Sequence, residues 1–127
     1  YVERAKSDNI KIIGFTAHTK IPAEQVKEIH NQEAESVIYT LGKIASESGC
    51  DAIVLEVGML KNEKIRELPV KKLIAGIRMN IEERGVQARV TLLRDLQEVK
   101  EFVDYIVISN RYVRNWEKLR EIICKLE

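Results

Sequence analysis

The stretch DAIVLEVGML (residues 51–60) decides the fold class of this chain. Its near-continuous apolar run is typical of a strand that is covered on both faces, as in a parallel sheet, because a strand with one wet face alternates apolar and polar residues. Three more runs are predicted to be strands: NIKIIGFTA (9–17), VQARVTLL (86–93) and YIVIS (105–109). None is joined to the next by a two-residue hairpin turn, so the strands are not predicted to form hairpins.

Helical patterns separate these runs. Apolar residues at three- and four-residue steps predict a long helix over about 23–48, a second over 63–84 that Pro69 kinks or divides, a short one from Asp95, and a last one over 112–126. Strands that alternate with helices need right-handed crossovers. We therefore expect an α/β fold: a three-layer sandwich with a mostly parallel four-stranded sheet and helices on both faces, flavodoxin-like or Rossmann-like, in the order β-α-β-α-β-α-β-α.

The bulk composition is that of one folded domain. The chain has 127 residues, 45% of them hydrophobic and 32% charged, which is far from the composition of disordered proteins. No repeat or flexible linker divides it, so residues 1–127 are predicted to be a single α/β domain. The opening YVERAKSDN (1–9) has the pattern of a helix end, which favours a domain excised from a longer protein.

The charges exclude some partners. Lys and Arg number 21 and Asp and Glu 20, with interspersed signs, so neither nucleic acid nor an anionic membrane is a predicted partner. No apolar run approaches the ~18 residues of a membrane span. Cys50 and Cys124 lie among apolar residues and are predicted to be free thiols, which favours a cytoplasmic protein. The abundance of Lys, Glu and Ile is typical of a thermophile surface.

Familiar catalytic and cofactor motifs are absent from the sequence. We find no G-x-G-x-x-G, P-loop, G-x-S-x-G or C-x-x-C motif, and the two His and two Cys are too far apart in sequence to suggest a zinc site. The sequence therefore predicts no catalytic residue and no metal ligand, leaves the cofactor undefined, and favours binding over catalysis.

Polar residues follow each predicted strand, at the edge where α/β sheets bind ligands. Several are cations, and together with hydroxyl donors and helix N-termini they would suit a nucleotide- or phosphate-like anion. The candidate ligand-binding residues are Thr16, His18, Lys20, Glu56, Lys61, Arg94, Ser109, Asn110 and Arg111. The alternative interpretation is that these are ordinary polar loops in a highly charged chain.

Two of these residues have side chains that could take part in catalysis. His18 has a side chain suited to general-base chemistry, although a loop histidine is more often only solvated. Glu56 lies inside an apolar run, so it must be paired, exposed at the strand end or functional. Asp51 is five residues away, on the opposite face of the strand, so a shared metal site is not expected.

The element order of the first half of the chain resembles one known group. A helix end, the strand IKIIGFTA, a loop containing Pro22, the long helix and CDAIVLEV (50–57) resemble the universal stress protein group of nucleotide-binding-like domains. The glycine-rich phosphate loop of that group is missing, since ISNRYVRNW (108–116) stands in its place, and no binding residue is carried over.

Three functions follow as hypotheses. The first is a regulatory or sensory domain of a larger protein that binds a small anion at the carboxyl ends of the strands. The second is an interaction or dimerisation module, with Trp116 and the apolar stripe of the last helix as its surface. The third is a small hydrolase or transferase that uses His18 with Glu56 or Asp95.

Overall fold

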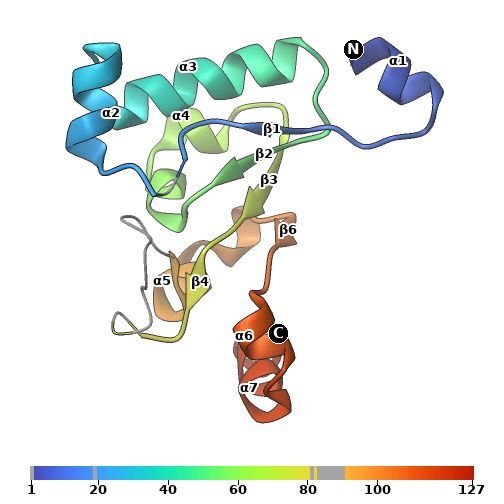
Figure 1. The fold of residues 1–127 in the computed structure, drawn as a ribbon, viewed down its shortest axis with the longest axis vertical. Coiled ribbons are helices and arrows are strands. Elements are labelled where there is room, and N and C mark those ends of the chain that lie inside the picture. The colour runs from blue at the N-terminus through green and yellow to red at the C-terminus, as the bar shows by residue number, and fades with distance from the viewer. Residues whose placement is uncertain (1, 19, 81, 83–90) are drawn as a thin grey trace.

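A computed structural model of the chain describes residues 2–18, 20–80, 82 and 91–127 (Figure 1). Helices and short strands alternate along the chain, and η marks a 3₁₀ helix. In order they are α1 (Val2–Ser7), β1 (Ile13–Phe15), α2 (Ala23–His30), α3 (Ala34–Glu47), β2 (Ala52–Leu55), η1 (Val57–Lys61), α4 (Glu63–Arg66), β3 (Lys71–Ile74), β4 (Ile77–Arg78), β5 (Thr91–Leu92), α5 (Leu93–Val99), η3 (Lys100–Phe102), β6 (Tyr105–Ile106), α6 (Asn110–Val113) and α7 (Trp116–Leu126).

The main sheet has four parallel strands in the order β1-β2-β3-β6. In its register Ile13 lies opposite Ala52, Ala52 opposite Lys71, and Leu73 opposite Tyr105. Strands β4 and β5 form a second, two-stranded parallel sheet. The fold class predicted from the sequence is confirmed: the protein is an α/β domain with a four-stranded parallel sheet and helices.

The third strand of the main sheet is not the predicted one. The expectation of a helix over 63–84 is wrong for residues 67–80, because Pro69 lacks an amide hydrogen and KKLI (71–74) extends into β3, while positions 81, 83 and 84 lie outside the described residues. Gly76, at φ 73°, then turns the chain into β4. Of the strand predicted over 86–93, residues 86–90 lie outside the described residues, and Thr91–Leu92 form β5 in the small sheet.

Two predicted helices are each divided in two. The long one breaks into α2 and α3 at Asn31, which adopts the left-handed conformation (φ 51°) that ends many helices. The last one breaks into α6 and α7 at Asn115, whose side-chain oxygen accepts the Lys118 amide hydrogen at 3.1 Å and caps α7. Apolar spacing alone did not show these breaks because it continues across them.

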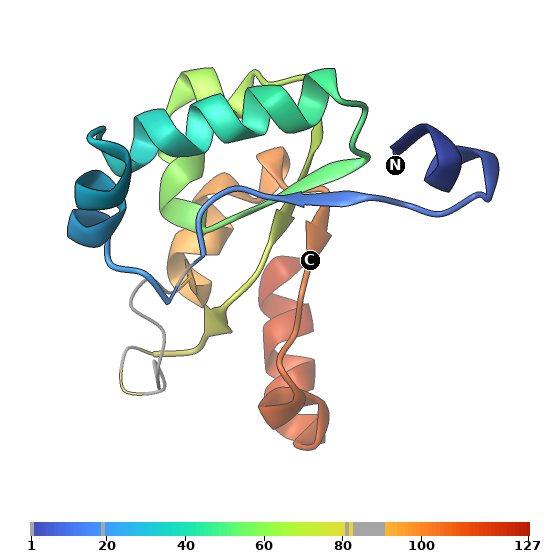
Figure 2. The same ribbon diagram turned by 45° about the horizontal axis from the view of Figure 1, so that its top comes forward.

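The core lies between the sheet and helices α3, α4 and α5. One cluster joins Ile38 of α3, Ile65 of α4 and Leu96 of α5 to Ile53 and Ile74 of the sheet. Figures 1 and 2 show the C-terminal helices α6 and α7 extending away from α3. In the described part of the chain, the helices pack mainly on this one face.

Cys50 is half-buried and Cys124 is exposed, and both are free thiols, as predicted. Among the described residues, no helix combines the length and the apolar content that crossing a membrane requires.

Candidate functional site

The carboxyl ends of all four main strands lie at one edge of the sheet, because the strands are parallel. Thr16 follows β1 at this edge, and its hydroxyl donates a hydrogen bond to the Val54 carbonyl oxygen at 3.0 Å. This predicted ligand contact therefore ties the end of β1 to β2. The next residues along the edge are Glu56 after β2 and Gly76 after β3.

Three polar side chains are buried at or beside this edge. Glu56 is 9% exposed, Arg78 is 8% exposed and Thr91 is fully buried. The Thr91 hydroxyl oxygen accepts the Val57 amide hydrogen at 3.1 Å, which fixes the small sheet against the end of β2. The Arg78 guanidinium donates to the Ile77 carbonyl oxygen at 2.7 Å. These buried polar groups lie at the edge where a parallel sheet normally binds ligands.

Helix α6 brings further polar groups next to β4. The Tyr112 hydroxyl oxygen accepts the Met79 amide hydrogen at 3.3 Å, and Tyr112 is fully buried. Arg78 precedes Met79 in the sequence, and Arg111 precedes Tyr112. The hydrogen bond between Met79 and Tyr112 therefore brings the segments that carry the two arginines together. Ser109 caps α6, where its hydroxyl oxygen accepts the Arg111 amide hydrogen at 3.4 Å. Asn110 is exposed at the first position of the helix.

Two of the predicted cations have acidic partners on the surface. The Lys61 ammonium lies 3.7 Å from the Glu98 carboxylate, and the Arg94 guanidinium lies 3.8 Å from the Asp95 carboxylate. Both cations are well exposed, although Asp95 is half-buried, so these ion pairs are weak and the cations stay accessible to other ions.

The predicted residues after β1 form a loop of their own. His18 accepts the Lys20 amide hydrogen at Nδ1, at 3.1 Å, and its ring stacks on Phe15 with the ring centres 6.5 Å apart. Both His18 and Lys20 are exposed. These two contacts join His18 to its own loop and to the end of β1, whereas the hydrolase hypothesis needs it beside Glu56 or Asp95.

Sequence reasoning missed Arg78. The residue fell within the predicted helix over 63–84, so it was not considered as a strand-end group. The signal that could have found it is the apolar run LIAGI (73–77), in which Gly76 separates two buried segments and Arg78 follows directly.

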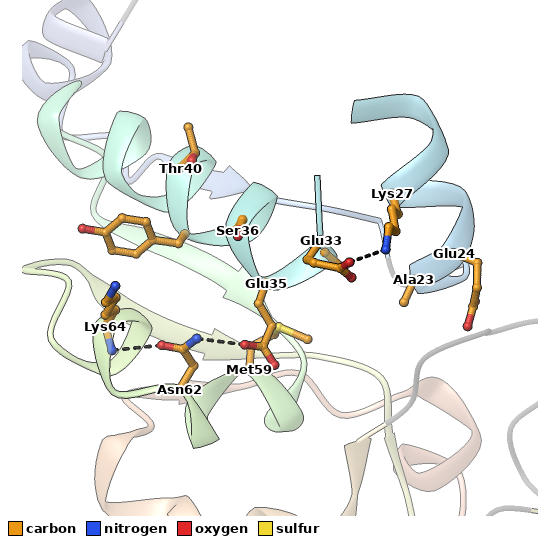
Figure 3. A pocket seen from close by; sticks show the side chains of 12 residues that line it. Ala23, Glu24, Lys27, Glu33, Glu35, Ser36, Thr40, Met59, Asn62 and Lys64 are labelled. Atoms are coloured by element: carbon orange, nitrogen blue, oxygen red, sulfur yellow. Dashed lines mark hydrogen bonds and ion pairs between the residues drawn. The ribbon is translucent and has the colours of Figure 1, made fainter. Parts of the chain in front are cut away.

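A separate hollow of about 790 Å³ lies between α2 and α3 on one side and η1 and α4 on the other (Figure 3). Lys27 forms an ion pair with Glu33 there, and Asn62 bridges two elements by donating to the Glu35 carboxylate at 2.9 Å while accepting the Lys64 amide hydrogen at 3.0 Å. Its lining includes three glutamates and two lysines, a balance that does not favour an anion. Among the described residues that line it, none is a predicted site residue.

Within residues 2–18, 20–80, 82 and 91–127, no group of three or more His, Cys, Asp or Glu side chains is placed to hold a metal ion. No protein-family model matches the chain, and no curated protein matches its sequence.

Proposed function

We propose that the chain is a regulatory or sensory domain that binds a small nucleotide- or phosphate-like anion at the carboxyl edge of its sheet. The observation on which this proposal rests is the position of Arg78, a buried cation next to the segment that holds Arg111 and Ser109. Arginine binds phosphate oxygens with two parallel hydrogen bonds, and a partly desolvated site strengthens them. Regulation, rather than catalysis, fits a site built from cations and hydroxyl groups without an evident nucleophile.

The other predicted contacts surround this centre. Thr16 and Glu56 belong to the same edge, Asn110 adjoins Ser109, and the exposed Lys20, Lys61 and Arg94 would steer an anion by long-range attraction. The two free thiols favour the cytoplasm as the proposed compartment.

The proposal is tested by titrating inorganic phosphate, pyrophosphate, AMP and ATP into the purified chain and measuring heats and melting temperatures. A ligand at a hundredfold excess over its dissociation constant adds about 2.7 kcal/mol to the free energy of unfolding. Arg111→Gln should lower the affinity for the anion about tenfold, because the variant loses one charge-assisted hydrogen bond.

Arg120→Gln is the matched control, because Arg120 is also exposed but lies on α7. It should leave the affinity unchanged. Absence of binding by all four anions at millimolar concentration, or an equal loss in both variants, would reject the carboxyl-edge site.

A further inference from the structure

The strand order has a consequence for where the helices lie. In the order β1-β2-β3-β6 each strand is added beside the one that precedes it in the main sheet, always in the same direction. Right-handed crossovers that all step in one direction place their helices on the same face of the sheet. This explains why α3, α4 and α5 share one core cluster with Ile53 and Ile74.

The opposite face of the sheet is apolar, and we call it the open face: Ile13, Phe15, Ala52, Val54, Leu73 and Tyr105. Side chains alternate along a strand, and the Cβ position of Gly14 points at Ala45 of α3, so Ile13 and Phe15 point away from the helices. Ala52, Val54 and Leu73 form a separate cluster there.

The open face is only partly shielded in a single chain. Phe15 is 69% exposed, Tyr105 47% and Ile13 44%, while Ala52 and Leu73 form part of the lining of a hollow of about 450 Å³. All-parallel sheets occur almost only with both faces covered. The exposed parts of these large side chains and of Val107 amount to roughly 400 Å², about half of what each partner buries in a stable interface.

Both edges of the sheet are also exposed. Strand β1 forms one edge and β6 the other, and apolar side chains stand at each, with Phe15 on β1 and Ile106 on β6. An exposed, apolar strand edge is a template for pairing with another strand. A partner that covered only the open face would leave both edges unpaired, so the best-fitting partner brings strands of its own.

We propose that two copies of this chain associate around a two-fold axis and close a single β/α barrel, of which that axis is the central axis. Parallel strands added in one direction, with helices outside, are half of an eight-stranded barrel. In the dimer β6 of each copy pairs with β1 of the other, so the two-fold symmetry leaves neither strand edge unpaired. The two open faces become the barrel interior, where their side chains interdigitate and fill the hollow.

The charged residues of the open face fit this arrangement. Lys11, Asp51 and Lys71 lie beside the amino ends of the strands, where a closed barrel still meets water. Lys11 and Asp51 already form an ion pair at 3.3 Å, and the Lys71 ammonium donates to the Tyr105 hydroxyl oxygen at 3.1 Å. Closure therefore leaves the ion pair of Lys11 with Asp51 and the hydrogen bond of Lys71 to Tyr105 in place. Closure places the carboxyl edges of both sheets at the same end of the barrel, but the dimer does not depend on anion binding.

The test is sedimentation equilibrium of the chain between about 1 and 200 µM, since association depends on concentration. A closed dimer gives twice the chain mass and no larger species. Phe15→Asp and, at the other edge, Ile106→Asp should each raise the dissociation constant about a hundredfold or more by burying an unpaired charge. Circular dichroism checks that each variant folds.

Ile29→Asp is the matched control, because Ile29 is 67% exposed, like Phe15, but lies on α2. It should leave the dimer intact. Hydrogen exchange adds a local readout: amides of 13–15 and 105–107 should be more protected in the dimer than in the dilute monomer. Three results would each overturn closure of the barrel. They are a chain that stays monomeric, species that grow beyond the dimer, and a dimer that is broken by Ile29→Asp and not by Phe15→Asp.

Discussion

The hydroxyl oxygen of Thr91 accepts the amide hydrogen of Val57 at 3.1 Å, and both residues are buried. Val57 begins η1 directly after Glu56, and Thr91 begins β5, so this bond holds the two-stranded sheet to the carboxyl end of β2. The geometry of the candidate anion site therefore depends on a hydroxyl group 34 residues away from the amide it binds.

Thr91→Val should reveal the contribution of this bond. The variant keeps the shape of the side chain but leaves a buried amide without its acceptor, which costs about 2 kcal/mol of the free energy of unfolding. Thr91→Ser keeps the hydroxyl, loses one methyl group and should cost only about 1 kcal/mol. Urea denaturation of both variants measures the difference, and a Thr91→Ser variant that is the less stable of the two would contradict the assignment.

Gly14 is predicted to be required for the packing of α3 on β1. A Cβ atom at this position would stand 2.9 Å from the Cβ of Ala45 and 3.6 Å from the sulfur of Cys50. Gly14→Ala should therefore lower the free energy of unfolding by about 1–3 kcal/mol through overpacking. Gly58→Ala is the matched control, because nothing lies within 4 Å of its Cβ position. Thermal denaturation should separate the two variants clearly, and equal melting temperatures would refute the close approach.

The sequence was enough to predict the fold class. The apolar runs around Ile53 and Phe15 predicted parallel strands, because both patterns are local and need no partner to be recognised. Leu73 and Ile74 were misassigned for a physical reason: their spacing from Ile77 fits a helix, and only Pro69 and Gly76 indicate the extended chain between them. Short apolar runs are ambiguous between the two structures until the neighbouring strands decide.

The site was harder to predict because it depends on contacts between distant segments. Thr16, Glu56 and Ser109 could be placed at one edge by counting strand ends, whereas the proximity of Arg78 to α6 follows from the bond between Met79 and Tyr112. The open face was not foreseen either, since its existence follows from strand order, which apolar patterns do not encode. Binding by the predicted residues stays a prediction.

Lys72 is a buried cation whose removal should stabilise the fold. It is 9% exposed, its ammonium donates to the Leu68 carbonyl oxygen at 2.6 Å, and burial lowers the pKa of its amine below the ordinary value of 10.5. Lys72→Met removes a charge that is costly to bury, and the Val70 amide still donates to the Leu68 oxygen. We expect a gain of about 1 kcal/mol at pH 7 in urea denaturation.

The pH dependence of this gain has a definite sign. Because the pKa is lower in the folded state, the native chain becomes more stable as pH rises from the folded-state pKa towards 10.5, where the lysine loses its proton in both states. The advantage of Lys72→Met should shrink over that interval. Lys71→Met is the control, because this neighbour is exposed and donates to Tyr105, so it should give no gain. A less stable Lys72→Met variant would show that the bond to Leu68 outweighs the burial of charge.

Asp51 should make the junction between β1 and β2 sensitive to acid. Its carboxylate accepts the Ile12 amide hydrogen at 2.8 Å and a bond from Lys11 at 3.3 Å, and the Ile12 bond is the main reason why the pKa of Asp51 lies below 3.8. A lowered pKa means that the stabilisation is complete above the unfolded-state pKa and is lost as pH falls through the folded-state pKa. Asp51→Asn keeps an oxygen for the Ile12 amide but has no charge, so its urea midpoint should lie below that of the wild type at pH 7. The two midpoints should converge as pH falls below 3.8 and through the folded-state pKa, where the wild-type carboxylate loses its charge as well. Asp51→Ala loses the acceptor and should be the least stable of the three chains at neutral and at acid pH, because the Ile12 amide then lacks this partner. If the gap between the wild type and Asp51→Asn stays constant from neutral to acid pH, the charge of Asp51 does not stabilise this junction.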